Sequence, residues 1–98
     1  MADNASTQWQ AIRPELWIWA DWEADYGIYD GGTGETHLLS ELPAEVLRQL
    51  SRHVMTAAAL TANLASLCEV EMAPAWTRKI GGILSELADL ELIEPVRL

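Results

Sequence analysis

The sequence predicts an α+β fold in which a three-stranded antiparallel sheet is followed by three helices. Two observations support this prediction. Six of the seven aromatic residues fall between Trp9 and Tyr29, and the apolar residues after Leu39 follow a helical period. The chain has 98 residues, and half of them are hydrophobic, which suits one domain with one core. We predict a frayed, disordered segment over residues 1–8, which are small and polar, and a folded domain over residues 9–98.

The predicted sheet lies within residues 16–39. Leu16–Ala20 has the pattern of a strand that is apolar on both faces, so we expect both faces to be covered. Tyr26–Tyr29 and Thr36–Leu39 have the composition of two further strands. Between them, the loop Asp30–Glu35 contains three glycines, which favour turns, and an aspartate that can bond the backbone ahead of it. These features predict an antiparallel hairpin.

Three helices are predicted after the sheet. Ser40 and Thr56 are placed to cap the first two, and a proline suits the first turn of the third. The third helix has the strongest helical period in the chain. With the glycine-rich hairpin as the wing, this order predicts a winged-helix-like architecture. The predicted ranges are 41–52 and 57–67 for the first two helices, a start at Pro74 for the third, and 92–96 for a closing extended tail.

The charge of the chain is strongly acidic and unevenly distributed. Fifteen acidic residues and six basic ones give a net charge of −9, and Arg13 is the one base within residues 1–45. Such a chain repels phosphates, so no nucleic acid is expected as a partner. No segment has the roughly 18 unbroken apolar residues of a membrane-spanning helix, so we expect a soluble, cytoplasmic protein without a membrane partner. A basic or neutral ligand, such as a peptide or another protein, suits this surface.

The sequence offers little support for catalysis or for a cofactor. The loop Gly31–Thr36 resembles the end of a phosphate-binding loop, but Glu35 stands where that motif has its lysine. The acids between Asp21 and Asp30 lack the spacing of a calcium loop, and two isolated histidines do not make a zinc site. Cys68, the one cysteine, cannot form an intrachain disulfide, and we expect it to be packed as a small hydrophobic residue. We therefore predict no enzyme activity, no metal and no other cofactor.

Binding is better supported, first by the predicted sheet. A sheet of three strands has two open edges, and a partner can add a fourth strand at either. In the last strand, Thr36 and Leu38 share one face, whereas His37 and Leu39 share the other. His37 is as compatible with an ordinary strand residue as with a ligand contact. These four residues form the first half of the candidate site.

The second feature is the pair Gly81–Gly82 inside the predicted third helix. Each glycine costs about 1 kcal/mol relative to alanine at such a position, so the close approach of another backbone should compensate. Gly82 shares a helix face with Arg78. The approaching backbone belongs either to the chain itself or to a ligand, and a local break in the helix is a third possibility. Arg78 and Lys79 are either solvated charges or partners for an acidic peptide.

The order of elements and four sequence segments resemble the PqqD family, and most closely its branch in the HPr-rel-A system. That branch typically shows a tryptophan-rich strand, a Tyr-Asp ending to the next strand, a Ser-Gly-Asp-Thr-His-Leu-Leu segment and a closing Leu-x-x-Leu-x-Leu-Ile-Glu-Pro. Here Thr33 and Glu35 replace the usual serine and aspartate and keep their chemistry. The resemblance covers about residues 9–96. In this chain the corresponding segments are Trp17–Trp22, Tyr29–Asp30, Thr33–Leu39 and Leu87–Pro95.

The resemblance implies a small winged-helix module, like a RiPP recognition element, that acts as a peptide chaperone without catalysis. Such a module binds the leader of a ribosomally made peptide and presents it to a modifying enzyme. The implied partners are a precursor or leader peptide, together with a modifying enzyme or an HPr-kinase-related protein of the same system. The leader would add a strand beside the third strand and pack against the third helix. The implied peptide-binding residues are Thr36, His37, Leu38, Leu39, Arg78, Lys79 and Gly82.

Two other functions remain open from the sequence. A winged-helix DNA-binding regulator is the main alternative, although Arg78 and Lys79 are few bases for a recognition helix. An enzyme subunit that offers a tryptophan-rich surface to a larger partner is the other. Five tryptophans in 98 residues also leave a homodimer open, with aromatic surface buried between copies. The sequence identifies neither the peptide nor its modification.

Overall fold

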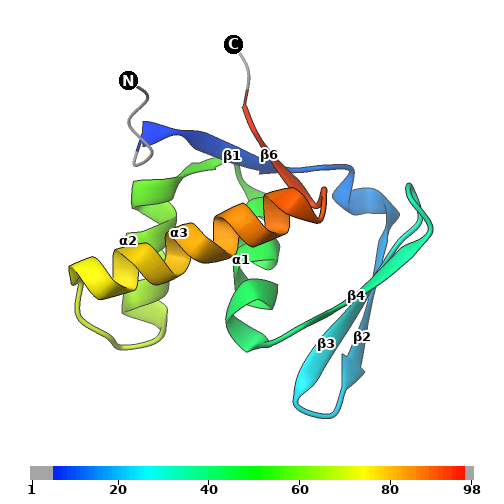
Figure 1. Ribbon diagram of the computed structural model, residues 1–98, viewed down its shortest axis with the longest axis horizontal. Coiled ribbons are helices and arrows are strands. Elements are labelled where there is room, and N and C mark those ends of the chain that lie inside the picture. Colours follow the sequence, from blue (N-terminus) through cyan, green and yellow to red (C-terminus); the bar gives the residue numbers. More distant parts are fainter. Residues whose placement is uncertain (1–5, 97–98) are drawn as a thin grey trace.

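The structure is a computed structural model that describes residues 6–96, except for the side chain of Trp22, and it shows an α+β fold (Figure 1). Three helices accompany two small antiparallel sheets of three strands each. The strands are β1 (Gln8–Ala11), β2 (Trp17–Trp22), β3 (Asp25–Asp30), β4 (Glu35–Leu39), β5 (Met55–Thr56) and β6 (Ile93–Pro95). The helices are α1 (Glu41–Arg52), α2 (Ala57–Leu67) and α3 (Pro74–Asp89), and a 3-10 turn covers Pro14–Leu16.

The predicted three-stranded sheet is present as an antiparallel meander with the order β2-β3-β4. Its strands are slightly longer than predicted, so the connection from β3 to β4 shortens to residues 31–34. Asp30 organises this turn, because its Oδ1 accepts a hydrogen bond from the N–H of Gly32 at 2.8 Å and its carbonyl accepts one from Gly34 at 2.7 Å. Gly34 has a φ of 80°, a left-handed conformation that glycine adopts without strain. These hydrogen bonds and the left-handed φ of Gly34 explain why the loop is rich in glycine.

The observed helices agree with the predicted ranges and starts. Both α1 and α2 match their predicted ranges, and α3 begins at Pro74. Thr56 caps α2, since its Oγ1 accepts a hydrogen bond from the N–H of Ala59 at 3.0 Å. Ser40 occupies the capping position of α1 but makes no side-chain capping bond.

The second sheet, with the order β5-β1-β6, was not predicted. Gln8 belongs to β1, and its carbonyl accepts a hydrogen bond from the N–H of Val96 at 2.8 Å. The carbonyl of Thr7 likewise accepts a hydrogen bond from the N–H of Ala57 at 3.0 Å. The predicted frayed segment therefore extends too far, and its residues 1–5 lie outside the described part of the chain. The partners of β1, β5 and β6, lie far away in the sequence, so no local sequence pattern predicts this pairing. Figure 1 shows β1 and β6 side by side along one end of the helices.

One face of the β2-β3-β4 sheet packs against the helices and contributes Trp17, Ile28 and Leu39 to the core. The other face is open, because no element covers it within residues 6–96: Ile18 is 65% exposed and Leu38 is 60% exposed. The expectation that both faces of the first predicted strand are covered is therefore wrong for the isolated chain. No helix in this part of the chain is long and apolar enough to cross a membrane.

Candidate functional site

The free edge of β4 is the first half of the candidate site. β4 pairs with β3 on one side, and no strand of residues 6–96 lies on its other side. No backbone hydrogen bond in this part of the chain connects residues 36–39 to any segment beyond the β3–β4 ladder. An edge of this kind presents unpaired N–H and C=O groups in register.

The hydrogen-bond pattern identifies which backbone groups of β4 face that edge. The N–H of Gly31 donates to the carbonyl of Leu16 at 2.9 Å, in continuation of the β2–β3 register. Hydrogen-bonded pairs alternate along an antiparallel ladder, so the odd-numbered residues of β3 bond to β2 and its even-numbered residues bond to β4. The even-numbered residues of β3 oppose the odd-numbered residues of β4. The N–H and C=O groups of Thr36 and Leu38 therefore point away from β3, toward the position of an added strand.

The side chains of Thr36 and Leu38 lie on the open face of the sheet. With residues of β2 and β3, they line a shallow apolar hollow of about 250 Å³. A strand added beside β4 would extend this face and place its own alternate side chains next to Leu38. The lining residues are Ile18, Ala20, Gly27, Tyr29, Thr36 and Leu38.

His37 and Leu39 point to the inner face of the sheet. Leu39 is buried in the core, and the side chain of His37 is only 9% exposed. The Nε2 atom of His37 is buried without a hydrogen-bond partner, and the nearest carboxylate oxygen, Oε2 of Glu35, lies 3.7 Å away. A buried polar group that lacks a partner costs about 1–3 kcal/mol. This cost, next to an open edge, makes His37 a suitable contact for a polar group brought by a ligand.

The predicted residues of α3 are all exposed, and the glycine pair is not packed against the chain. A Cβ atom added at Gly81 or at Gly82 would meet no heavy atom within 4 Å other than those of its chain neighbours and of its own helical backbone. The helix runs unbroken from Pro74 to Asp89. Within residues 6–96, the internal-packing and helix-break interpretations of the pair are therefore wrong. The third interpretation, the approach of a ligand, stays a prediction.

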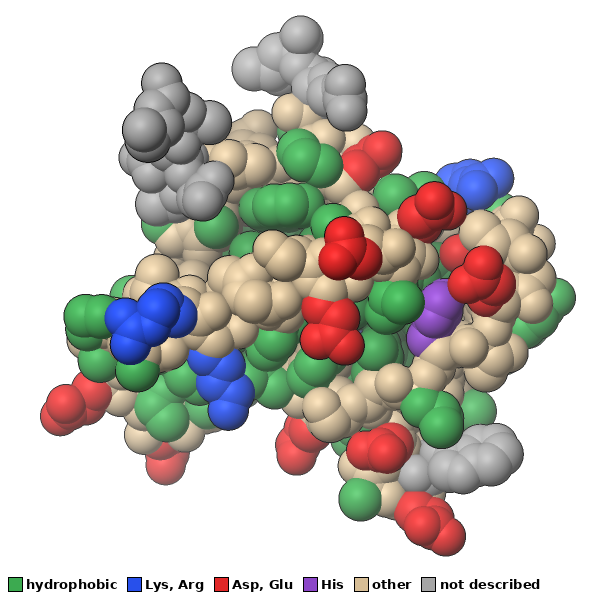
Figure 2. All heavy atoms as spheres, viewed as in Figure 1, with side chains coloured by type: hydrophobic (Ala, Val, Ile, Leu, Met, Phe, Trp, Pro, Cys, Tyr) green, Lys and Arg blue, Asp and Glu red, His purple; other side chains and the backbone are tan. Residues whose placement is uncertain are grey.

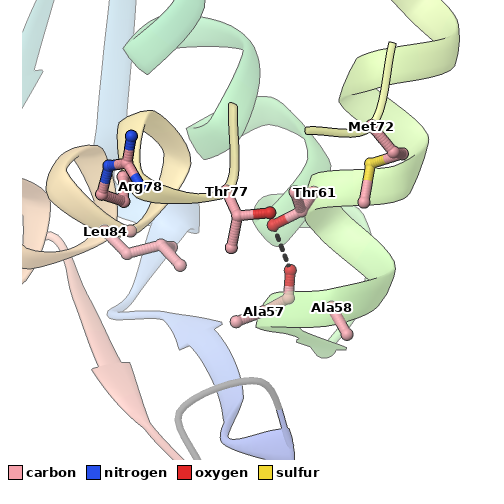
Figure 3. Close-up of a pocket in the computed structure, with 8 residues that line it drawn as sticks. Ala57, Ala58, Thr61, Met72, Thr77, Arg78 and Leu84 are labelled. Carbon is pink, nitrogen blue, oxygen red and sulfur yellow. Dashed lines mark hydrogen bonds between the residues drawn. The ribbon is translucent and has the colours of Figure 1, made fainter. Parts of the chain in front are cut away.

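A cavity of about 400 Å³ lies between α2 and α3, and one of the predicted residues, Arg78, belongs to it (Figure 3). Gly81, rather than the predicted Gly82, lies in its wall. Among residues 6–96, the main cavities contain no residues of β4 and α3 together, and neither Lys79 nor Gly82 lines any of these cavities. The predicted residues of β4 and α3 therefore line no common cavity: Thr36 and Leu38 line the hollow on the sheet, and Arg78 lines the cavity between α2 and α3. The cavity is lined by Ala57, Ala58, Thr61, Met72, Thr77, Arg78, Gly81 and Leu84.

Sequence reasoning missed Gly81, although the sequence carries a signal for it. Thr77, Gly81 and Leu84 follow the spacing i, i+4 and i+7, which places them along one flank of α3. The position of α2 decides which flank of α3 borders the cavity, and the sequence does not supply that position.

The charges on α3 are separated along its length. Basic side chains lie over its N-terminal half and acidic side chains over its C-terminal half (Figure 2). The helix contains two bases, Arg78 and Lys79, and two acids, Glu86 and Asp89. A ligand along α3 therefore meets opposite charges at the two ends of the helix.

Most tryptophans serve the core of the chain. Trp17 is buried, and Trp9, Trp19 and Trp76 pack against the core. The guanidinium of Arg48 lies 5.0 Å from the ring centre of Trp19. This distance is that of a cation–π contact within the chain. The aromatic content thus gives less support to a tryptophan-mediated homodimer than the sequence suggests.

Cysteine and metal chemistry receive no positive support from the structure. Cys68 is exposed just after α2, so the expectation that its thiol is packed is wrong. The buried stripe of α2 ends at Ala65, three residues earlier. Among the residues that the structure describes, no group of three or more His, Cys, Asp or Glu side chains could hold a metal ion.

Comparison of the chain with protein-family models, with curated proteins and with solved structures found no match.

Proposed function

We propose that the chain is a non-catalytic adaptor that binds a precursor or leader peptide as an added strand on β4 and presents it to a modifying enzyme. The observation that carries this proposal is the open edge, where Thr36 and Leu38 direct their backbone groups away from β3. In strand addition, main-chain hydrogen bonds supply affinity, and contacts to alternate side chains supply specificity.

The two faces of the sheet give the added strand two different environments. On the open face, its side chains would lie beside Leu38 and extend the apolar hollow. On the inner face, they would lie beside His37, whose Nε2 lacks a partner. A suitable peptide therefore alternates apolar side chains with polar ones, and one polar group hydrogen-bonds His37.

The proposed role of α3 is to provide a second contact for the peptide through Arg78, Lys79 and Gly82. Gly82 is exposed and leaves open space beside the helix. A peptide side chain can use this space, which would compensate for the cost of about 1 kcal/mol that a glycine imposes on a helix. The winged-helix-like arrangement belongs to the same proposal, with the β3–β4 hairpin as its wing and β5-β1-β6 as an addition. A further partner of the chain would be a modifying enzyme or an HPr-kinase-related protein in the cytoplasm.

A winged-helix DNA-binding regulator is the competing function, and charge argues against it. The net charge is −9, and the C-terminal half of α3 carries Glu86 and Asp89. Both features repel a phosphate backbone. Tight retention on heparin at low salt would favour the regulator, whereas elution in the flow-through agrees with the adaptor.

The proposal is tested with peptides selected on the purified chain from a random display library and then titrated into the ¹⁵N-labelled chain. We expect the largest amide shifts at residues 36–39 and 78–82, and smaller shifts in α1. Gly82→Leu should weaken binding while the fold is retained. Shifts confined to residues 17–22 would refute the proposed site, and unchanged affinity in Gly82→Leu would remove α3 from it.

A further inference from the structure

The cavity between α2 and α3 differs from the β4 edge in position and in chemistry. Its volume of about 400 Å³ lies in the range of small-molecule sites. The first turns of α2 contribute small side chains to its wall, Ala57 and Ala58. The hydroxyl of Thr61 is already used, because it donates to the carbonyl of Ala57 at 2.6 Å, as the dashed line in Figure 3 shows. This part of the wall therefore offers a ligand mainly apolar surface.

Gly81 keeps the cavity open on the side of α3. It lies in the wall, and a Cβ atom added there would meet nothing within 4 Å. A glycine inside a helix costs about 1 kcal/mol relative to alanine, yet no segment of residues 6–96 uses the space that it leaves. A ligand that packs on Gly81 would compensate for this cost.

Arg78 is the one charged residue in the lining of the cavity. Its guanidinium makes no ion pair with any carboxylate in the described part of the chain. It lies in the second turn of α3. Figure 3 shows Arg78 and Leu84 extending from the α3 side of the cavity and Met72 on the opposite side. The cavity therefore combines apolar walls with one available cation.

We infer that this cavity binds a small aliphatic carboxylate, with the aliphatic chain against Gly81 and Leu84 and the carboxylate on Arg78. An apolar chain suits the alanine, methionine and leucine side chains of the wall. A carboxylate suits a guanidinium, which presents paired N–H donors in a matching geometry. This site lies apart from the β4 edge, and Arg78 is the one residue that it shares with the proposed peptide contact on α3.

Octanoate, used below micelle-forming concentrations, is the probe for this inference. Its binding is followed on the amide signals of Ala57, Ala58 and Thr77 and on the indole N–H of Trp76. That indole donates to the carbonyl of Thr61 at 3.0 Å and so contacts a residue of the cavity wall. Octylamine and 1-octanol are the controls, because they keep the chain length and change the charge. We expect saturable shifts with octanoate and clearly weaker binding of octylamine.

Matched variants on α3 test separately the apolar contact at Gly81 and the carboxylate contact at Arg78. Gly81→Leu should abolish octanoate binding, whereas Gly82→Leu, one position outside the cavity, should leave it unchanged. Arg78→Gln should weaken octanoate binding about two- to fivefold, without changing the affinity for 1-octanol, and Lys79→Gln should have no effect. Far-UV circular dichroism confirms that each variant folds.

Three results would overturn the inference: no saturable shift with octanoate, octanoate affinity unchanged in Gly81→Leu, or octylamine binding as tightly as octanoate. None of them affects the adaptor proposal, which depends on peptides at β4 and on Gly82. Failure of peptide binding with intact octanoate binding would conversely refute the adaptor and leave this site standing.

Discussion

The substitution Leu38→Pro tests strand addition at the level of a single hydrogen bond. Proline has no N–H, and the N–H of Leu38 faces the open edge rather than β3. Proline is tolerated on an edge strand where the missing N–H faces solvent. The side chain of Leu38 is 60% exposed, so little buried area is lost. We therefore expect the free variant to keep the β3–β4 ladder.

The effect on peptide binding follows from the lost donor. A net hydrogen bond contributes about 0.5–1.5 kcal/mol, and an acceptor left unpaired in the bound peptide moves the loss toward the upper end. Since 1.4 kcal/mol corresponds to a factor of ten, the dissociation constant should rise about five- to tenfold. The reference is Leu38→Ala, which also removes the side chain but keeps the N–H, and the assay is isothermal titration calorimetry with a selected peptide.

Two outcomes would refute this reasoning. If Leu38→Pro binds peptide as tightly as Leu38→Ala, the N–H of Leu38 does not bond the peptide. His37→Pro removes an N–H that bonds β3 and should disrupt the sheet. If Leu38→Pro disrupts the sheet to the same extent in amide spectra, the assignment of outward-facing groups on β4 is wrong.

Two further predictions concern stability and are measured by urea unfolding. Thr56→Ala should lower the free energy of unfolding by about 1 kcal/mol, because it removes the capping bond of α2; Ser40→Ala is the control, since Ser40 makes no such bond, and equal losses would contradict the capping assignment. Gly34→Ala should destabilise the chain by about 1 kcal/mol, because its φ is 80°, whereas Gly82→Ala should stabilise it by about 1 kcal/mol. A loss of stability in Gly82→Ala would show that the space beside this glycine is not open.

Features that depend on neighbouring residues could be predicted from the sequence. The ranges of α1 and α2 follow from their apolar period and from Ser40 and Thr56 at their starts. The turn from β3 to β4 follows from Asp30 and its glycines. The alternation along β4, with Leu38 outward and Leu39 inward, follows from the two-residue period of a strand.

Features that depend on distant segments could not be predicted. The pairing of β1 with β6 joins Gln10 to Glu94, and four residues of mixed polarity give no sign of it. The apolar side chain of Ile18 led to the prediction that the outer face of β2 is covered. The helices instead pack on the inner face, and Ile18 is exposed. The choice between Gly81 and Gly82 likewise depends on the position of α2. The missing information in each case is tertiary packing.

The most direct test of the account measures amide hydrogen exchange along β4, with and without a selected peptide. In the free chain, the amides of Thr36 and Leu38 should exchange rapidly, while those of His37 and Leu39 should be protected by β3. Peptide should then slow exchange at Thr36 and Leu38. Protection of these two amides in the free chain, or no change when peptide binds, would contradict the claim that β4 receives an added strand.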